Sequence, residues 1–280
     1  MYMRFNNLIG SKKRIWELDA LRGLAVLLMI FDHFMIDISM LPAFFSNFFS
    51  NADSWVIDFY NLGNYYVFSH IREAGHYIFA FLFILITGVS CHLSSSNFMR
   101  AVELAVVSMG ITIAFSLFSS FSGGDSQIIF GILHCLTISI FLYIIIKKIF
   151  KKDIFLLFFG AIIIFVGIML PWYDYTYIYT IEGATWGETL KNVLDVVLGL
   201  KCYGEDYFGL IPSAGVLLVG AYIGSKFYNY RKSLLPSMDG SWNAGLTMIG
   251  RHALIIYILH QLIIPLLIVF VGVINGFTIF

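Results

Sequence analysis

The run ALRGLAVLLMIFDHFMIDIS, residues 20–39, decides the fold class. It is apolar over most of its length, and a helix needs about 20 such residues to cross a bilayer. Similar runs, bounded by charges or turn residues, lie near 76–95, 100–120, 127–146, 153–171, 207–225 and 251–275. We therefore predict an all-α, polytopic helical membrane protein with about seven transmembrane helices.

The overall composition agrees with a membrane protein. Of the 280 residues, 59% are hydrophobic and only 12% are charged, whereas about 25% of the residues of a soluble domain are charged. Lys and Arg together number 17, as do Asp and Glu, so the chain has no net charge to attract nucleic acid. We expect the lipid bilayer, and no nucleic acid, as a partner. No internal repeat is evident, and we expect a single transmembrane domain over residues 1–280.

Basic residues indicate the direction of the helices, since they stay on the cytoplasmic side. A cytoplasmic N-terminus places 14 of the 17 Lys and Arg residues inside and leaves Arg72, Lys191 and Lys201 outside. A cleaved signal peptide is the competing interpretation of the N-terminal region. Asp32 and His33 interrupt its apolar core, and no small-residue cleavage site follows. We expect an integral, multi-pass protein.

Two segments on the outer side are longer than connectors need to be, residues 40–75 and 172–206. The first is rich in aromatic residues and Asn. In the second, Leu190, Val193 and Val197 recur at helical spacing, which predicts a short helix at the membrane interface. The aromatic residues form either an interfacial belt or a lid over an outward-facing pocket.

The first predicted helix carries ionisable side chains, which are costly inside a bilayer unless they are paired or line a wet cavity. Arg22 and His33 are eleven residues apart. That is almost three turns, so they share one helix face, about 16 Å apart along the axis. Asp37 follows His33 at i+4 and falls on the same stripe. This face therefore carries a cation near the cytoplasmic edge and a His/Asp pair deep in the membrane.

Further histidines lie on other predicted helices. His134 and His260 reach a depth comparable with that of His33, so three imidazoles meet near one level if these helices are neighbours. His76 opens the second helix on the outer side, and His70 is close by. For a single buried histidine, an interhelical hydrogen bond is the alternative to a functional role.

No metal site is expected. The histidines lie on separate helices, without H-E-x-x-H or a similar ligand spacing. The three cysteines include no C-x-x-C pair, and their odd number predicts neither a zinc site nor a disulfide framework.

Several short motifs follow one another in a recognisable order. They are WELDALRGLA (16–25), LMIFDH (28–33), FILITGVS (83–90), SNFMR (96–100), FGILHCL (130–136), DYFGLIP (206–212) and GRHALIIYILHQ (250–261). In this order the motifs resemble the heparan-α-glucosaminide N-acetyltransferase catalytic-domain family, which is related to other transmembrane acyltransferases. The resemblance covers nearly the whole chain.

The resemblance implies transfer of an acyl group, usually acetyl, from cytoplasmic acyl-CoA to an acceptor on the far side of the membrane. The acceptor is often an amino sugar or glycan, and the implied location is the bacterial cytoplasmic membrane. In the lysosomal branch, the position of His33 is not histidine and the essential histidine lies in the following luminal loop. That role could fall to His70 or His76 here. The chain also departs from the pattern at Ser213, where bacterial relatives often have Trp.

Three arginines are candidates for binding the donor. Arg22, Arg100 and Arg251 lie at the expected cytoplasmic rim, and a guanidinium fork suits the phosphates of acetyl-CoA or another acyl-CoA. The distance from Arg22 to His33 is comparable with an extended pantetheine arm. The thioester would then lie beside the imidazole.

The catalytic candidates are His33, Asp37, His76, His134 and His260. His33 would act as general base on the acceptor or carry the acyl group transiently. Asp37, or else Asp32, would orient its ring. His134 and His260 would polarise the thioester carbonyl or position the acceptor.

Two other function classes remain open. The first is a proton-coupled transporter or permease, in which His33, Asp37, His134 and His260 form a relay. The second is a non-catalytic membrane scaffold, in which apolar residues could replace the buried histidines. The oligomeric state is also open, with a homo-oligomer as one possibility.

Overall fold

The structure is a computed structural model that describes residues 14–122, 127–170, 176–178, 180–204 and 206–279. It is 78% helical, which confirms the predicted all-α class. Two short strands, β1 (Thr176–Tyr177) and β2 (Lys201–Cys202), pair in parallel.

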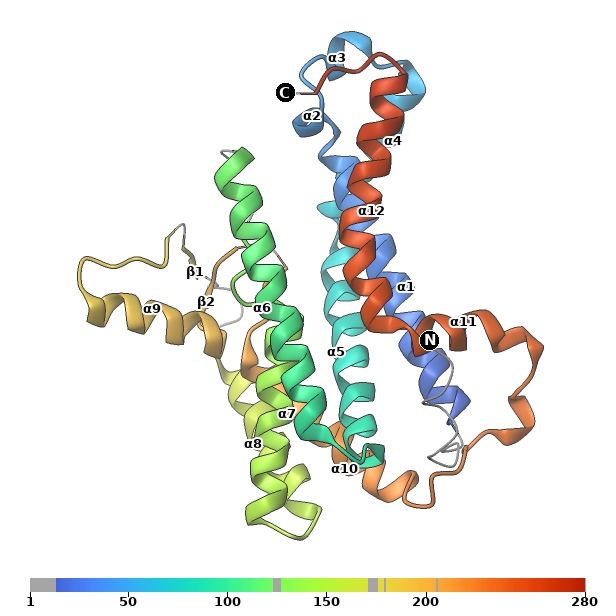
Figure 1. The fold of residues 1–280 in the computed structure, drawn as a ribbon, viewed down its shortest axis with the longest axis vertical. Coiled ribbons are helices and arrows are strands. Elements are labelled where there is room, and N and C mark those ends of the chain that lie inside the picture. Colours follow the sequence, from blue (N-terminus) through green and yellow to red (C-terminus); the bar gives the residue numbers. More distant parts are fainter. Residues whose placement is uncertain (1–13, 123–126, 171–175, 179, 205, 280) are drawn as a thin grey trace, which may run out of the picture. The chain divides into compact units, whose positions relative to one another are not determined.

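Within the described ranges, seven long helices coincide with the seven apolar runs (Figure 1). They are α1 (Trp16–Ser39), α5 (His70–Leu93), α6 (Asn97–Ser122), α7 (Ile132–Ile149), α8 (Ile154–Met169), α10 (Leu210–Phe227) and α12 (Ala253–Ile274). The shorter elements are α2 (Leu41–Phe44), α3 (Phe48–Asn51), α4 (Ser54–Val67), α9 (Trp186–Leu198), α11 (Ala244–Arg251), η2 (Pro236–Met238) and η3 (Ser241–Asn243).

Within the described residues, five helices are long and apolar enough to cross a membrane: α5, α6, α7, α10 and α12. Helix α8 is apolar but has only 16 residues. Helix α1 has 24 residues, but it contains several charged side chains. The predicted count of about seven spans is therefore not confirmed, and the cytoplasmic position of the N-terminus stays a prediction.

The two segments predicted on the outer side contain more helix than the sequence indicated. Residues 40–75 hold α2, α3, α4 and the start of α5, which begins at His70 rather than near residue 76. Phe45 and Phe48 are buried there and form an aromatic core with Phe277. The short helix predicted from the spacing of Leu190, Val193 and Val197 is present as α9. Its position at the membrane interface stays a prediction.

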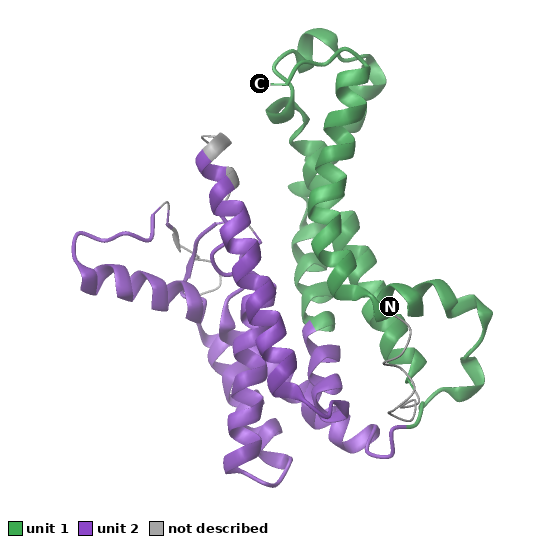
Figure 2. Cartoon of the chain, in the orientation of Figure 1, with its two compact units in different colours: residues 1–83, 232–280 green, residues 84–231 purple. Residues whose placement is uncertain are grey.

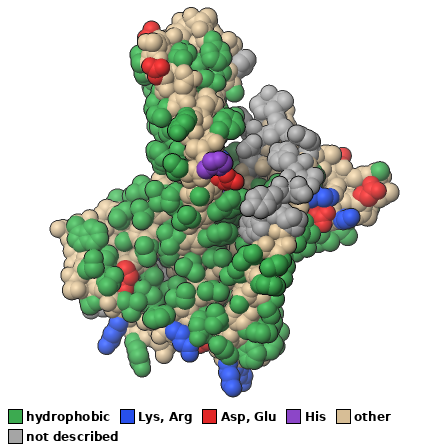
Figure 3. Space-filling model, turned by 180° about the vertical axis from the view of Figure 1, so that it is seen from behind, with side chains coloured by type: hydrophobic (Ala, Val, Ile, Leu, Met, Phe, Trp, Pro, Cys, Tyr) green, Lys and Arg blue, Asp and Glu red, His purple; other side chains and the backbone are tan. Residues whose placement is uncertain are grey.

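The described chain forms two compact units (Figure 2). Unit 1 comprises residues 1–83 and 232–280, and its α1 packs against α4, α11 and α12. Unit 2 comprises residues 84–231, in which α10 packs against α7 and α8, and α6 packs against α7. Hydrophobic side chains are spread over the described face in Figure 3 with few charged ones between them, which suits contact with lipid.

Two glycines allow α1 and α11 to cross with their backbones in contact. A Cβ atom on Gly250 would lie 1.7 Å from the carbonyl oxygen of Asp19, and one on Gly23 would lie 2.0 Å from that of Leu246. No side chain larger than hydrogen fits at either position. This close crossing brings the end of α11 to the first turns of α1.

Candidate functional site

The first turns of α1 hold a carboxylate surrounded by arginines. Asp19 Oδ1 lies 3.0 Å from Arg22 Nη1, and Asp19 Oδ2 lies 3.5 Å from Arg251 Nε and 3.7 Å from Arg14 Nη1. The Asp19 side chain is only 9% exposed, whereas those of Arg14 and Arg251 are 61% and 45% exposed. We call these four residues the Asp19 cluster. It contains two of the three predicted donor-binding arginines.

Neighbouring residues of α1 fasten the chain that leads into α11. The buried Glu17 carboxylate accepts hydrogen bonds from Ser233 Oγ (2.8 Å) and from the Leu234 N–H (2.6 Å). Trp16 Nε1 donates to the Leu235 carbonyl over 3.1 Å. These contacts give Glu17 and Trp16 a structural role, whereas the arginines contact Asp19.

A second carboxylate cluster lies near the other end of α1. Asp32 Oδ1 accepts hydrogen bonds from Arg72 Nε (2.9 Å) and from the Tyr66 hydroxyl (3.0 Å). Asp32 Oδ2 accepts a hydrogen bond from Arg72 Nη2 (3.3 Å) and lies 3.6 Å from His76 Nδ1. The Asp32 side chain is 5% exposed and that of His76 is 32% exposed. We call Asp32, Tyr66, Arg72 and His76 the Asp32 cluster.

Tyr66 enters this cluster from α4, outside the predicted spanning helices. Burial raises the pKa of its phenol to about 12, and the nearby Asp32 charge acts in the same direction. The phenol therefore stays protonated at neutral pH and donates its hydrogen to the carboxylate.

His33 meets His260 rather than Asp37. Nδ1 of His33 lies 3.0 Å from Nε2 of His260, and the ring centroids are 5.0 Å apart. Because this contact joins two imidazoles, one of the two nitrogens must carry the proton. The Asp37 carboxylate makes no hydrogen bond or ion pair with any residue in the described ranges. Its predicted role as the partner of the His33 ring has no contact to support it.

The shared face of Arg22 and His33 points toward α11 and α12. Arg22 Nη1 lies 3.5 Å from the Gly250 carbonyl at the end of α11, and His33 contacts His260 in α12. Asp32 lies on a different face of α1, which is turned toward α4 and α5. Consecutive residues of one helix thus serve two different clusters.

Two predicted site residues lie in unit 2. His134 Nδ1 accepts the Gly131 N–H (3.3 Å), and its Nε2 lies 3.2 Å from Thr112 Oγ1. The Thr112 hydroxyl donates to the Ile128 carbonyl, so His134 Nε2 is the donor to Thr112. One ring nitrogen of His134 thus caps the start of α7, and the other joins α7 to Thr112 of α6. A catalytic role for His134 stays a prediction, as does donor binding by Arg100.

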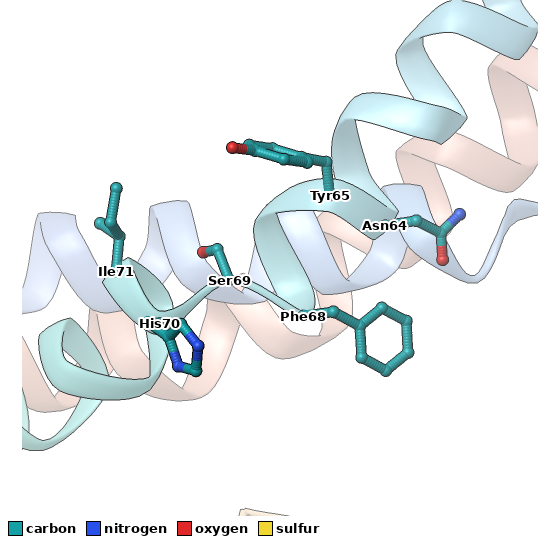
Figure 4. A pocket seen from close by; sticks show the side chains of 6 residues that line it. All are labelled: Asn64, Tyr65, Phe68, Ser69, His70 and Ile71. Carbon is teal, nitrogen blue, oxygen red and sulfur yellow. The ribbon is translucent and has the colours of Figure 1, made fainter.

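His70 provides a contrast with His76. Its Nδ1 lies 3.4 Å from Glu73 Oε2, but both side chains are exposed to solvent. His70 also lines an open pocket of about 560 Å³ at the turn between α4 and α5, together with Asn64, Tyr65, Phe68, Ser69 and Ile71 (Figure 4). The labelled side chains point in different directions and do not converge on one centre.

The residues that sequence reasoning missed are Arg14, Asp19, Tyr66 and Arg72. Tyr66 and Arg72 lie 34 and 40 positions from Asp32 in a segment predicted as an outer connector. No spacing rule links residues on separate elements. Among the described residues, no group of three or more His, Cys, Asp or Glu could hold a metal ion, and the expected absence of a metal stays a prediction.

One protein family matches most of the chain. The model described as "Heparan-alpha-glucosaminide N-acetyltransferase, catalytic" matches residues 14–262. This range includes both carboxylate clusters and the His33–His260 pair. No curated protein and no solved structure matches the chain.

Proposed function

Since the chain belongs to the heparan-alpha-glucosaminide N-acetyltransferase catalytic family, we propose that it transfers an acetyl or other acyl group from cytoplasmic acyl-CoA to an acceptor on the outer side of the membrane. The family and the apolar helices make it a membrane acetyltransferase. The finer proposal concerns the donor and the acceptor, which we take to be acyl-CoA and an amino sugar, glycan or other acceptor.

One observation carries the proposal: Arg22 and His33 both face α11 and α12. They are eleven residues apart along α1, or roughly 16 Å at the helical rise. Phosphates of acyl-CoA would bind at the Asp19 cluster, where guanidinium groups outnumber carboxylates. The pantetheine arm would then run along α1 and place the thioester near His33. Arg100 remains a donor-binding candidate on sequence grounds.

We assign acid–base chemistry to the His33–His260 pair. The acceptor nitrogen or oxygen attacks the thioester carbonyl carbon, and its proton passes to the His33 imidazole. The C–S bond breaks, its electron pair stays on sulfur, and the thiolate then takes up a proton. His260 stabilises the protonated ring through the shared hydrogen bond. Direct acyl transfer and a transient acyl group on His33 both fit these contacts.

The family match spans sequence from both units, which supports one acyltransferase-like domain over residues 1–280. We place this domain in a bacterial cytoplasmic membrane, with the lipid bilayer and acyl-CoA as its partners. The alternative function as a proton-coupled transporter has no support in the family match.

Transfer of labelled acetyl from acetyl-CoA to a panel of amino sugars and glycans tests the function. Purified His33→Gln should lose transfer by about 10²-fold or more, the range of a missing general base. His252→Gln is the matched control, because His252 is an exposed histidine of the same unit. Wild-type turnover by His33→Gln would remove His33 from the mechanism. Absence of transfer and of thermal stabilisation by acetyl-CoA in the wild type would contradict the proposed function.

Arg22 tests the donor site separately. Arg22→Ala should raise the KM for acetyl-CoA more than it lowers kcat, because it removes a phosphate contact and leaves the reacting groups in place. Lys148→Ala removes an exposed cation outside the cluster and should change neither constant. An unchanged affinity of Arg22→Ala for CoA would contradict donor binding by this residue.

A further inference from the structure

The Asp32 cluster brings three hydrogen bonds and one close histidine to one carboxylate. Arg72 donates two of the hydrogen bonds and Tyr66 donates the third, and His76 Nδ1 lies 3.6 Å from Oδ2. Arg72 and His76 come from α5 and Tyr66 comes from α4, so three helices, counting α1, meet at Asp32. A buried carboxylate needs a partner of opposite charge, and the two hydrogen bonds from the Arg72 guanidinium already provide one. The contact with His76 is therefore not needed to balance the charge of Asp32.

The remaining contact, to His76, has the geometry of a held acid–base histidine. Asp32 Oδ2 faces Nδ1 of the ring, and a carboxylate at that nitrogen selects the tautomer with the proton on Nδ1. The carboxylate is covered, at 5% exposure, whereas the ring is one-third exposed. The imidazole can therefore be approached from outside while its partner stays out of reach.

His70 shows what an ordinary histidine–carboxylate pair looks like on the same helix. Its contact with Glu73 is about as long, 3.4 Å against 3.6 Å for His76 and Asp32. Both side chains of the His70 pair are exposed, and exposed pairs hold their geometry weakly. Of the two outer histidines, only His76 has a partner that is itself fixed by further hydrogen bonds.

We infer that Asp32, Arg72 and Tyr66 are positioning residues that hold His76 to take the proton from the acceptor. This inference rests on the proposed function and revises its acceptor side: the base that takes the acceptor proton is His76 in place of His33. The acceptor nitrogen or oxygen forms a bond to the acyl carbon, its proton passes to the His76 imidazole, and the C–S bond breaks. The sulfur keeps the electron pair and later takes up the proton. His33, the next residue after Asp32, would then lie beside the thioester of the acyl-CoA donor.

Single variants give the first test, with kcat and both KM values as the readout. His76→Gln should lower kcat by about 10²-fold to 10⁴-fold, the contribution of general acid–base catalysis. Asp32→Asn should approach that loss, and Tyr66→Phe should lose about tenfold in kcat, because each loosens the ring without removing it. The KM for acetyl-CoA should not change. His70→Gln and Glu73→Gln are the matched controls and should behave like the wild type.

A double-mutant cycle separates positioning from simple structural support. If Asp32 acts through His76, Asp32→Asn in the His76→Gln background should cost no further activity. A merely structural carboxylate would lower activity by the same factor in both backgrounds. Arg72→Lys should recover only part of the activity lost in Arg72→Gln, because lysine restores the charge without the fork.

Thermal stabilisation by acetyl-CoA serves as the folding control for each variant. If Asp32→Asn does not fold, the cycle of Tyr66→Phe with His76→Gln carries the same test. Additive losses in the cycle, or wild-type kcat in His76→Gln, would overturn the inference while leaving the proposed function standing. A wild-type protein that transfers no acetyl group to any acceptor would overturn both.

Discussion

The two carboxylate clusters of α1 differ in what their partners offer. Asp19 and Asp32 are thirteen residues apart, or roughly 20 Å along the helix. Both are buried. The described partners of Asp19 are all arginines, whereas Asp32 is bound by an arginine, a phenol and an imidazole. One helix thus gathers three guanidinium groups near one end and a guanidinium, a phenol and an imidazole near the other.

The charge balance of each cluster explains the difference. Three arginines against one carboxylate leave the Asp19 cluster with a formal charge of +2, which favours an anionic ligand. The charges of Arg72 and Asp32 sum to zero. This difference is the basis for proposing anion binding at the Asp19 cluster and acid–base chemistry at the Asp32 cluster.

The largest effect is expected from a variant that breaks the Asp19 cluster alone. Gly250→Ala places a methyl group 1.7 Å from the Asp19 carbonyl oxygen, so α1 and α11 must separate. We expect a loss of about 3 kcal/mol in the free energy of unfolding. Gly245→Ala, in the same helix, is the control, since no atom would lie within 4 Å of the added Cβ. Equal unfolding temperatures for the two purified variants would contradict the close crossing.

Truncating each carboxylate compares the clusters directly. Asp32→Ala leaves Arg72 with three-quarters of its side chain covered and no carboxylate partner. We expect a loss of about 2 kcal/mol in stability, reduced from the value for a fully buried pair because Arg72 is partly exposed. Asp19→Ala should cost less, because Arg14 and Arg251 reach water and the covered Arg22 keeps its contact with the Gly250 carbonyl. Chemical unfolding in detergent measures both, and a larger loss for Asp19→Ala would reverse the comparison.

Arg14 should affect donor binding and nothing else. Arg14→Ala is expected to raise the KM for acetyl-CoA by about twofold to fivefold, which corresponds to one exposed ion pair. The difference from the wild type should shrink as salt is added, because exposed charges are screened. Transfer assays at low and high ionic strength measure this effect. A change in kcat that persists at high salt would mean that the Asp19 cluster does more than bind an anion.

The smallest effect concerns the pH dependence of stability at Tyr66. Its pKa in the folded chain is raised from 10 to about 12. Between these values the unfolded chain ionises and the folded chain does not, so this stabilisation is complete below pH 10 and is lost as pH rises toward 12. Tyr66→Phe should therefore lose less thermal stability than the wild type between pH 9 and pH 11. The exposed Tyr65→Phe should follow the wild type, and identical slopes for all three would contradict the burial of the phenol.

Much of the fold could be predicted because helix formation in an apolar run is a local property. Each of the seven runs became a long helix, and the spacing around Leu190 located α9. The helices α2, α3 and α4 were missed because they are short and have an aromatic-rich sequence that also suits an interfacial belt. Their core forms only when Phe277, from the far end of the chain, packs against Phe45 and Phe48.

The candidate site was predictable along one helix and not between helices. The 3.6-residue period was enough to place Arg22 and His33 on one side of α1. The same period also placed Asp37 near His33, yet the His33 ring contacts His260 instead. Which side chains meet across an interface depends on the rotation of both helices and on their register, and periodicity within one helix contains neither.

From residue order alone followed the all-α class, the lengths of the main helices and the stripe that joins Arg22 to His33. These depend on hydrophobic length and helical pitch, which act within a single segment. Only the tertiary structure decided that Asp19 gathers Arg14, Arg22 and Arg251, and that Asp32 binds Tyr66, Arg72 and His76. Such partners lie up to hundreds of residues apart, and they meet because glycine-lined crossings and packed aromatic residues set how the helices of unit 1 are turned toward one another.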